Sequence, residues 1–350
     1  MSTSLEGHLP PRIRLLADDL TGALDSAAAF AGAVPVYLDE PGADDAPVSA
    51  VATATRDVPL LGLRRQLARS LAWLPGATLA FKKVDSLLRG NTFAECALAA
   101  RGFERVVFAP AFPAQGRVTL DGRAWVRQPG STVLHPIGRQ PVIDALAAAG
   151  LTGPDVPEVW VPDVRDDADL DAVAALARDP ASRRWLWCGS AGLAHALARS
   201  LGMAARPAPV DAVAPPVWLV SASRHEVLRR QWARLLAEPA VAPAVEAFAF
   251  AAAEPLNPAL AAARLGEQMD ALVARPARPG ALVVIGGDTL RALCVASAAT
   301  ALLSEASPRP GWGRARLVGG RFDGLVCHSR SGAFGTDDDL LAMVREVTGT

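Results

Sequence analysis

The sequence predicts an α/β protein of two domains, each a mostly parallel sheet flanked by helices, with the functional site in the cleft between them. The chain has 350 residues, and a typical domain has about 150. Short apolar runs alternate with helical patterns, which is typical of βαβ units. An Ala- and Pro-rich stretch interrupts this alternation, and the rhythm then resumes. We therefore expect a substrate domain over 1–205, a linker over 206–215 and a second domain over 216–350.

In the first domain, short apolar runs predict strands at residues 13–17, 34–38, 48–53, 79–83, 105–109, 159–161 and 185–188. Helical patterns lie between them, at residues 23–31, 63–73 and 166–177. Several of the strands run directly into polar residues. Because ligands bind beyond the carboxyl ends of parallel strands, these polar residues mark the expected site.

In the second domain, apolar runs predict strands at residues 217–220 and 281–285. A Pro- and Ala-rich stretch, residues 274–279, precedes the later strand. A run of Ala and Leu predicts a helix that ends near Leu303, because both residues favour helices.

Composition excludes several classes of function. Lys and Arg number 35 against 36 Asp and Glu, so we expect no nucleic-acid partner and no binding to an anionic membrane. No apolar run reaches the roughly 18 residues of a membrane span, and the N-terminus does not resemble a signal peptide. The four cysteines are widely spaced, which predicts buried free thiols and a cytoplasmic protein.

Two adjacent carboxylates, Asp18 and Asp19, follow the first strand and precede the first helix. One can cap the helix by accepting from its free N–H groups, and the other then points into the cleft. A carboxylate in the cleft can hold a substrate hydroxyl or take its proton. We expect the catalytic group to be one of this pair. The alternative is that both are ordinary cap and turn residues.

The segment Lys82–Asn91 places three cations, a carboxylate, a hydroxyl and an amide directly after a strand. Arg suits a carboxylate or phosphate as a planar fork, and Lys suits it as a point charge. We therefore expect this segment to bind an anionic substrate. A solvated run of surface charge is the alternative. The rigid loop Pro110–Arg117 that follows offers Gln115 or Arg117 to a substrate group, or is a plain turn.

Four turns rich in Gly, Ser and Thr follow predicted strands, at residues 188–192, 221–223, 286–289 and 331–335. Backbone N–H groups in such turns bind phosphate where they open onto helix N-termini. The sequence contains neither the P-loop nor the dinucleotide fingerprint. We therefore expect a nucleotide site of another type. The five histidines have no metal-ligand spacing, and no metal ligand can be assigned.

Together these motifs resemble the signatures of the four-carbon acid sugar kinase family. The run Ala17–Ala23 with Asp25 is similar to its first signature, Lys82–Asn91 to its second and Pro110–Arg117 to its third, and the Gly-rich turns follow in the same order. The resemblance implies a kinase that uses ATP and Mg²⁺ to phosphorylate the terminal hydroxyl of threonate, erythronate or 3-oxo-tetronate. It places the sugar acid on the N-terminal domain and the nucleotide on the C-terminal domain.

The resemblance also implies a role for individual residues. Asp19 and Asp18 would be catalytic. The substrate side would be formed by Arg56, Lys82, Lys83, Asp85, Arg89, Asn91 and Arg117. The nucleotide side would be formed by Ser190, Ser223, Gly286, Gly287, Thr289, Arg330, Gly332 and Gly335.

Some residues depart from the family pattern. Ala222 stands where a Gly usually precedes the serine, and Arg330 and Ala333 replace a Lys and a Gly or Asn. An Ala restricts φ and adds a methyl group where phosphate would approach. Two alternatives therefore stay open: a catalytically weak relative that binds a sugar acid or nucleotide as a sensor, and a kinase for another small hydroxy acid. A homodimer is expected only because enzymes of this size are commonly dimers.

Overall fold

The computed structural model describes residues 12–350 except 44–45, 129, 208, 251–256 and 310. The strands of the first half are β1 (Ile13–Ala17), β2 (Val34–Leu38), β3 (Val48–Ala52), β4 (Leu79–Lys83), β5 (Arg105–Ala109), β9 (Glu158–Trp160) and β10 (Trp185–Gly189). Those of the second half are β11 (Val217–Ser221), β12 (Val245–Ala249), β13 (Ala281–Ile285), β14 (Ala301–Glu305), β15 (Gly313–Val318) and β16 (Val326–Arg330).

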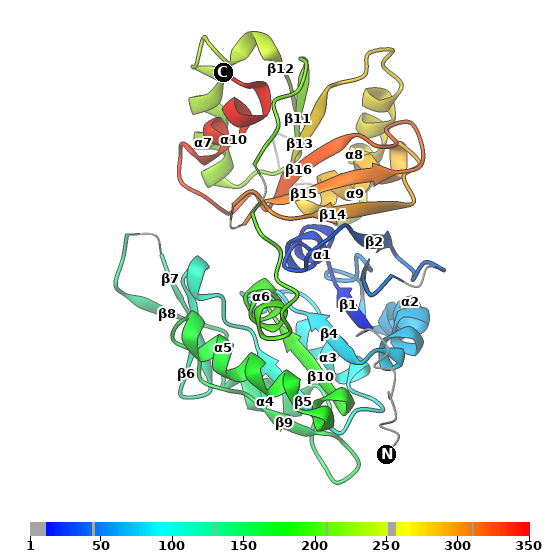
Figure 1. Ribbon diagram of the computed structural model, residues 1–350, viewed down its shortest axis with the longest axis vertical. Helices are drawn as coiled ribbons and strands as arrows, with labels where there is room; N and C mark the ends of the chain where they lie inside the picture. Colours follow the sequence, from blue (N-terminus) through cyan, green and yellow to red (C-terminus); the bar gives the residue numbers. More distant parts are fainter. Residues whose placement is uncertain (1–11, 44–45, 129, 208, 251–256, 310) are drawn as a thin grey trace, which may run out of the picture.

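These strands form one continuous, mostly parallel sheet. Its order is β12-β11-β13-β16-β15-β14-β2-β3-β1-β4-β10-β5-β9. The α/β class and the mostly parallel arrangement are therefore confirmed, but the two expected sheets are joined edge to edge. The joint is an antiparallel pairing of β2 with β14, in which Val36 lies opposite Leu302. Figure 1 shows the two halves stacked along the long axis, with β2 at their junction.

Helices cover both faces of this sheet. Those of the first half are α1 (Leu20–Ala27), α2 (Leu60–Trp73), α3 (Thr92–Ala99), α4 (Val142–Ala148), α5 (Asp167–Ala175) and α6 (Ala191–Ser200). Those of the second half are α7 (Glu226–Leu236), α8 (Pro258–Val273), α9 (Gly287–Ala296) and α10 (Asp339–Thr348). On one face, α1, α5, α6, α8 and α9 share a single apolar core that runs through both halves. The opposite face carries two separate cores, one under α3 and α4 and one under α7 and α10.

The second half differs from expectation at one helix. The predicted Ala/Leu helix does not reach Leu303, because α9 ends at Ala296 and residues Ala301–Glu305 form β14. Ala298 adopts a left-handed φ of 56°, which turns the chain out of the helix. Pairing with β2 and β15 then outweighs the intrinsic preference of Ala and Leu for helix.

A second sheet was not anticipated from the sequence. β6 (Arg117–Leu120), β7 (Arg123–Arg127) and β8 (Leu134–Ile137) form an antiparallel meander. Figure 1 shows it at one side of the first half. It begins at the end of the loop Pro110–Arg117, so it anchors one wall of the region that the motifs mark.

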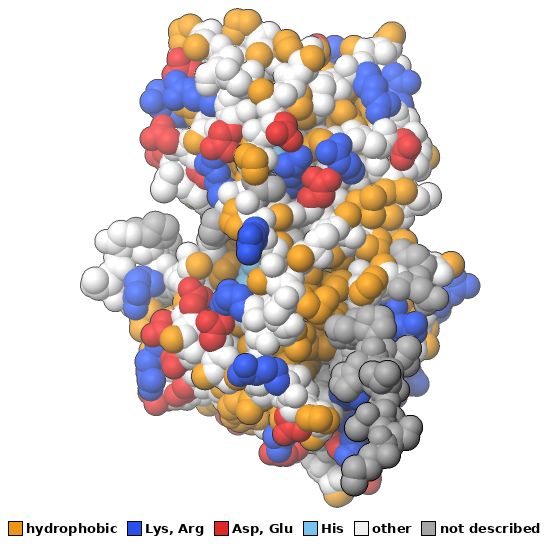
Figure 2. All heavy atoms as spheres, in the orientation of Figure 1, with side chains coloured by type: hydrophobic (Ala, Val, Ile, Leu, Met, Phe, Trp, Pro, Cys, Tyr) orange, Lys and Arg blue, Asp and Glu red, His pale blue; other side chains and the backbone are white. Residues whose placement is uncertain are grey.

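The surface agrees with the balanced charge of the chain. On the face shown in Figure 2, Lys and Arg side chains are interspersed with Asp and Glu. No helix in the described part of the chain is long and apolar enough to cross a membrane. The four cysteines are buried free thiols, as expected.

The junction between the halves generates a stability prediction. Leu302 is fully buried opposite Val36, so we expect Leu302→Ala to lower the free energy of unfolding by about 2–5 kcal/mol. Leu61→Ala removes a fully exposed side chain and should change it by less than about 0.5 kcal/mol. Urea denaturation followed by circular dichroism measures both. An equally small loss in the two variants would show that the β2–β14 pairing contributes little to stability.

Candidate functional site

A cleft between the two halves is lined by Asp19, by four of the predicted substrate-side residues and by two of the predicted nucleotide-side residues. The first half lines it with Asp19, Thr21, Gly22, Asp25, Arg56, Lys83, Asp85, Ser86, Arg89, Phe112, Ser190 and Ala191. The second half lines it with Gly311, Gly313, Ser329, Arg330, Ser331 and Phe334. The cleft lies beyond the carboxyl ends of β1, β4, β10 and β16, where ligands bind to sheets of this type.

A larger hollow lies elsewhere, against α2 and α3. Its charged lining residues are Arg64, Arg101, Glu104 and Asp155. None of the residues predicted from the motifs lines it. In the part of the chain that the structure describes, no ion pair joins two of its charged residues. The chemistry therefore concentrates in the smaller cleft between the halves.

Asp19 both caps α1 and faces the cleft. Its Oδ2 accepts from the Gly22 backbone N–H at 3.2 Å and from the Thr21 hydroxyl at 2.5 Å. Asp18 lies under it, with only 2% of its surface exposed. The expected division of labour between the two aspartates is therefore wrong, because one residue performs both roles. Successive side chains at a strand end point to opposite faces, which turns Asp18 away from the cleft.

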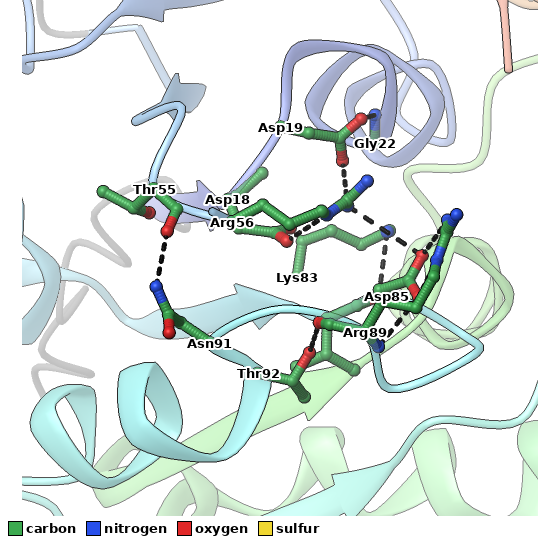
Figure 3. Close-up of polar contacts among 12 residues, drawn as sticks. Asp18, Asp19, Gly22, Thr55, Arg56, Lys83, Asp85, Arg89, Asn91 and Thr92 are labelled. Atoms are coloured by element: carbon green, nitrogen blue, oxygen red, sulfur yellow. Dashed lines mark hydrogen bonds and ion pairs between the residues drawn. The ribbon is translucent and has the colours of Figure 1, made fainter. Parts of the chain in front are cut away.

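Arg56 joins the two aspartates (Figure 3). Its Nε lies 2.7 Å from Asp18 Oδ2, and its Nη2 lies 2.7 Å from Asp19 Oδ1 and 3.9 Å from Asp85 Oδ1. These carboxylates outweigh the effect of burial and raise the pKa of Arg56. Burial alone would raise the pKa of Asp19, but the charges of Arg56 and Lys83 outweigh it, and the pKa of Asp19 is lowered. Asp19 is therefore an anion at neutral pH.

Asp85 and Arg89 form a second ion pair at the cleft. The guanidinium donates from Nε and Nη2 to the two Asp85 oxygens at 2.8 Å each. Burial would raise the pKa of Asp85, but the hydrogen bonds and charge of Arg89 keep it below its usual range. Asp85 also accepts from the backbone N–H groups of Leu87 and Arg89. Its oxygens are thus occupied in shaping the loop.

The two adjacent lysines of β4 point to opposite faces of the sheet. Lys83 lines the cleft, and its Nζ donates to the Val84 carbonyl at 2.9 Å. Among the described residues, no carboxylate lies within ion-pair distance of this Nζ. Lys82 is buried on the other face, where its Nζ lies 2.8 Å from Glu95 Oε2. The structure therefore does not bring Lys82 to the predicted substrate side.

Asn91 lies behind the cleft instead of lining it. Its side-chain amide donates to the backbone carbonyls of Thr55 at 2.8 Å and Val58 at 2.7 Å. Its own N–H donates to the Arg56 carbonyl at 3.1 Å. The residue thus fastens the turn that carries Arg56 to the loop that carries Arg89.

Four predicted nucleotide-side residues converge at the carboxyl ends of β11 and β13. The Thr289 hydroxyl accepts from the Ala222 N–H at 3.1 Å, and Ser223 follows in the same turn. Gly286 has a φ of 108°, which favours glycine, and precedes the N-terminus of α9. A methyl group on Gly287 would lie 3.2 Å from Asp19 Oδ2. The N-terminus of α9 therefore abuts the carboxylate of the opposite half.

The last motif folds over this turn. A methyl group on Gly332 would lie 2.4 Å from the Ser223 hydroxyl, so only glycine allows the close approach. Gly335 has a φ of 83° and packs beside Arg330. Arg330 itself is buried, where it donates to Asp339 at 2.7 Å and lies over the Trp312 ring. Burial lowers the pKa of Arg330 to about 10.

Two predicted residues lie apart from their assigned groups. Ser190 belongs to the first half, where it caps α6 through the Gly192 N–H at 3.1 Å and donates to the Ala111 carbonyl. It is not grouped with the nucleotide-side turns. Arg117 is outside the cleft lining, but its guanidinium lies 5.3 Å from the Phe334 ring of the other half.

The cleft also contains residues that sequence reasoning did not assign. Thr21 and Asp25 belong to the same motif as Asp19, and the three-residue spacing of Gly22 and Asp25 on a helix was a usable signal. Phe112 and Phe334 bring aromatic rings to the cleft. Both belong to segments that the motifs cover, Pro110–Arg117 and residues 331–335, but their convergence on one cleft follows from the fold and not from a local pattern.

Within the described ranges, no three His, Cys, Asp or Glu side chains converge on a metal position. Mg²⁺ in phosphoryl-transfer sites commonly takes only one or two carboxylates and otherwise uses phosphate oxygens and water. Asp288, in the first turn of α9, has a raised pKa because of burial and of the nearby Asp57 and Asp19 carboxylates. This concentration of negative charge beside a phosphate-binding type of turn suits a divalent cation.

Comparison with known proteins gives consistent matches. Residues 13–143 match the sugar-binding N-terminal domain family. A D-threonate kinase of Bordetella bronchiseptica is 29% identical over 96% of this chain and 98% of its own length. A D-threonate kinase of Cupriavidus necator is 33% identical over 59% of each chain.

Solved structures share the fold. A Salmonella typhimurium structure aligns with a TM-score of 0.73 at 19% identity, covering 96% of this chain and 99% of its own. A Haemophilus influenzae structure aligns with a TM-score of 0.66 at 17% identity, covering 96% and 100%. At these identities the likeness concerns the fold alone.

The buried pair Lys82–Glu95 generates a prediction about stability. Glu95→Gln removes the carboxylate that pairs with the buried Lys82 ammonium, so we expect the free energy of unfolding to fall by about 3–5 kcal/mol. Removing Glu40, whose partner Arg69 is on the surface, should cost less than about 1 kcal/mol. Urea denaturation at pH 7 measures both. Equal, small losses would show that Lys82 does not depend on Glu95.

Proposed function

The chain belongs to the four-carbon acid sugar kinase family, and we propose that it transfers a phosphoryl group from ATP to a hydroxyl of a four-carbon sugar acid of the threonate, erythronate or 3-oxo-tetronate type. The relatives named D-threonate kinase support the reaction class. One observation of this chain carries the proposal. The phosphate-binding type of turn at Gly286–Gly287, in the second half, abuts the carboxylate of Asp19, in the first half.

The proposal assigns the acceptor hydroxyl to Asp19. Its lowered pKa makes it a weak base but a permanent hydrogen-bond acceptor, which suits a group that aims a hydroxyl at phosphorus. Phosphoryl transfer depends mainly on positioning and on neutralising charge. The hydroxyl oxygen bonds to the γ-phosphorus, the bond to ADP breaks, and Asp19 receives the hydroxyl proton late in the step.

Lys83 supplies positive charge to the same centre. It lines the cleft beside Asp19, and its ammonium group keeps donors available for an anion, whether the substrate carboxylate or the transferred phosphoryl group. The free N–H groups at the start of α9 add donors for phosphate. Bound Mg²⁺ would neutralise charge on the nucleotide phosphates, and Asp288, in the first turn of α9, would offer it a carboxylate.

In this proposal the sugar acid binds the first half, over 1–205, and the nucleotide binds the second half, over 216–350, with 206–215 as the connection. The buried free thiols fit a reducing cytoplasm. A homodimer stays a prediction, and sedimentation analysis of the purified protein tests it.

Asp19→Asn should abolish most of the activity. An amide keeps the shape but loses the charge, so we expect kcat to fall by about 10²–10⁴-fold. The assay is ADP release with ATP, Mg²⁺ and a panel of D- and L-threonate, D-erythronate and their 3-oxo forms. Asp171→Asn, at an exposed ion pair with Arg199, is the control. Wild-type turnover of none of these acids would contradict the assigned substrate class, and absence of ATP binding by calorimetry would favour a sensor.

Gly332→Ala should affect the nucleotide and not the acid. The added methyl group would lie 2.4 Å from the Ser223 hydroxyl and displace the last motif. We expect the KM for ATP to rise about tenfold, equivalent to about 1.4 kcal/mol of binding. Gly62→Ala is the matched control, because its nearest neighbour would be 4.0 Å away. A rise in the KM for the sugar acid alone would place the acid in the second half.

A further inference from the structure

Arg56 was assigned to the substrate side by sequence, but its contacts indicate another role. We propose that Arg56 is a positioning residue, which holds the carboxylate of Asp19 in place for the acceptor hydroxyl instead of binding the sugar acid. Asn91 acts through it as a second positioning residue. This inference rests on the proposed kinase function and deepens it.

The Nε and Nη2 edge of the Arg56 guanidinium is occupied by Asp18 and Asp19. Nε and Nη2 each lie 2.7 Å from a carboxylate oxygen, of Asp18 and Asp19 respectively. Two parallel charge-assisted bonds of this length restrict both carboxylates. The Asp19 carboxylate is then fixed at both oxygens, because Thr21 and the Gly22 N–H hold the other one. A lysine lacks the planar fork that makes these two parallel bonds from separate nitrogens.

The backbone of Arg56 is fixed as firmly as its side chain. The Asn91 N–H donates to the Arg56 carbonyl at 3.1 Å, and the Thr55 N–H donates to the Asp18 carbonyl at 3.1 Å. A methyl group on Gly90 would lie 2.4 Å from the Arg56 carbonyl oxygen, so this loop packs directly on the turn. Asn91 adds two side-chain bonds to the same turn, to Thr55 and Val58. The turn therefore has little freedom to follow a substrate.

The charge of Arg56 also acts on the ionisation of Asp19. Asp19 is faced by Arg56 from the turn after β3, Lys83 from β4, Arg89 from the loop after β4 and Asp288 from α9. Burial and Asp288 favour the neutral acid, while the three cations favour the carboxylate. Because Arg56 is the leading cationic influence, its loss raises the pKa of Asp19. The acidic limb of the pH–rate profile then moves to higher pH, since only the carboxylate accepts from the hydroxyl.

The test compares Arg56→Lys and Arg56→Ala with the wild-type enzyme, using the acid that the wild type phosphorylates. For Arg56→Lys we expect kcat to fall about 100-fold, because a displaced Asp19 no longer aligns the hydroxyl, with the KM for the acid unchanged within about twofold. The acidic limb of the kcat profile should shift upward. Added guanidinium or ethylguanidinium ion should restore part of the activity of Arg56→Ala. Arg69→Lys, at the surface pair with Glu40, should behave as wild type.

Asn91→Ala tests the second step. It should lower kcat with the same upward shift of the acidic limb, to a smaller extent than Arg56→Lys, because Arg56 keeps its side chain but loses the support of its turn. A rise in the KM for the acid at constant kcat, in either variant, would overturn the inference and make the residue a substrate ligand.

A readout independent of activity separates this inference from the proposed function. Carboxyl ¹³C NMR titration of Asp19, assigned by comparison with Asp19→Asn, should give a higher pKa in Arg56→Lys than in the wild type. An unchanged titration would overturn the inference even if the enzyme is an active kinase. If the wild type turns over no acid, the kinase proposal fails, and the upward shift still supports Arg56 as the group that holds Asp19.

Discussion

The antiparallel pairing of β2 with β14 determines how the halves of this molecule meet. This pairing joins the strands of the two halves into one sheet, and the helices on one face of that sheet share a single core across the junction. The bidentate ion pair of Arg291 on α9 with Asp39 at the end of β2 reinforces the same contact. As a result the N-terminus of α9 lies against Asp19. Chemistry between the halves depends on this strand pairing, although neither strand carries a site residue.

Beneath the cleft, charge alternates from one face of the sheet to the other. Glu95 pairs with Lys82 under the sheet. The charge of Asp18 also favours the protonated form of Lys82. Asp18 and Asp19 are then bridged by Arg56. A buried charge is tolerated only when each neighbour compensates it. This explains why a segment so rich in charge folds as a strand end, and why so few of its groups remain available to a ligand.

Sequence reasoning predicted the strands well where apolar runs end in polar turns, as at β1, β4 and β13. It failed at β14, since Ala and Leu favour helix locally, and pairing with β15 and with the distant strand β2 makes that segment a strand. The same limit applies to the site. Motifs identified the residue types, but the alternation of side chains along β4 places Lys82 and Lys83 on opposite faces of the sheet. Asn91 supports the turn of Arg56, because its side chain donates to the distant carbonyls of Thr55 and Val58.

A continuous sheet also restricts how the cleft can close around its ligands. A hinge motion that rotates one half against the other would have to break or strongly twist the β2–β14 pairing. It would also disrupt the core that α1 and α9 share. Contacts across the cleft are made instead by loops, where the Phe334 ring meets Arg117 and Gly311 approaches Gln115. These contacts lie outside the large sheet, whereas α9 is held against Asp19 by the sheet and the core that it shares with α1. Exclusion of water is therefore a property of the loops, and alignment of the reacting groups is a property of the sheet.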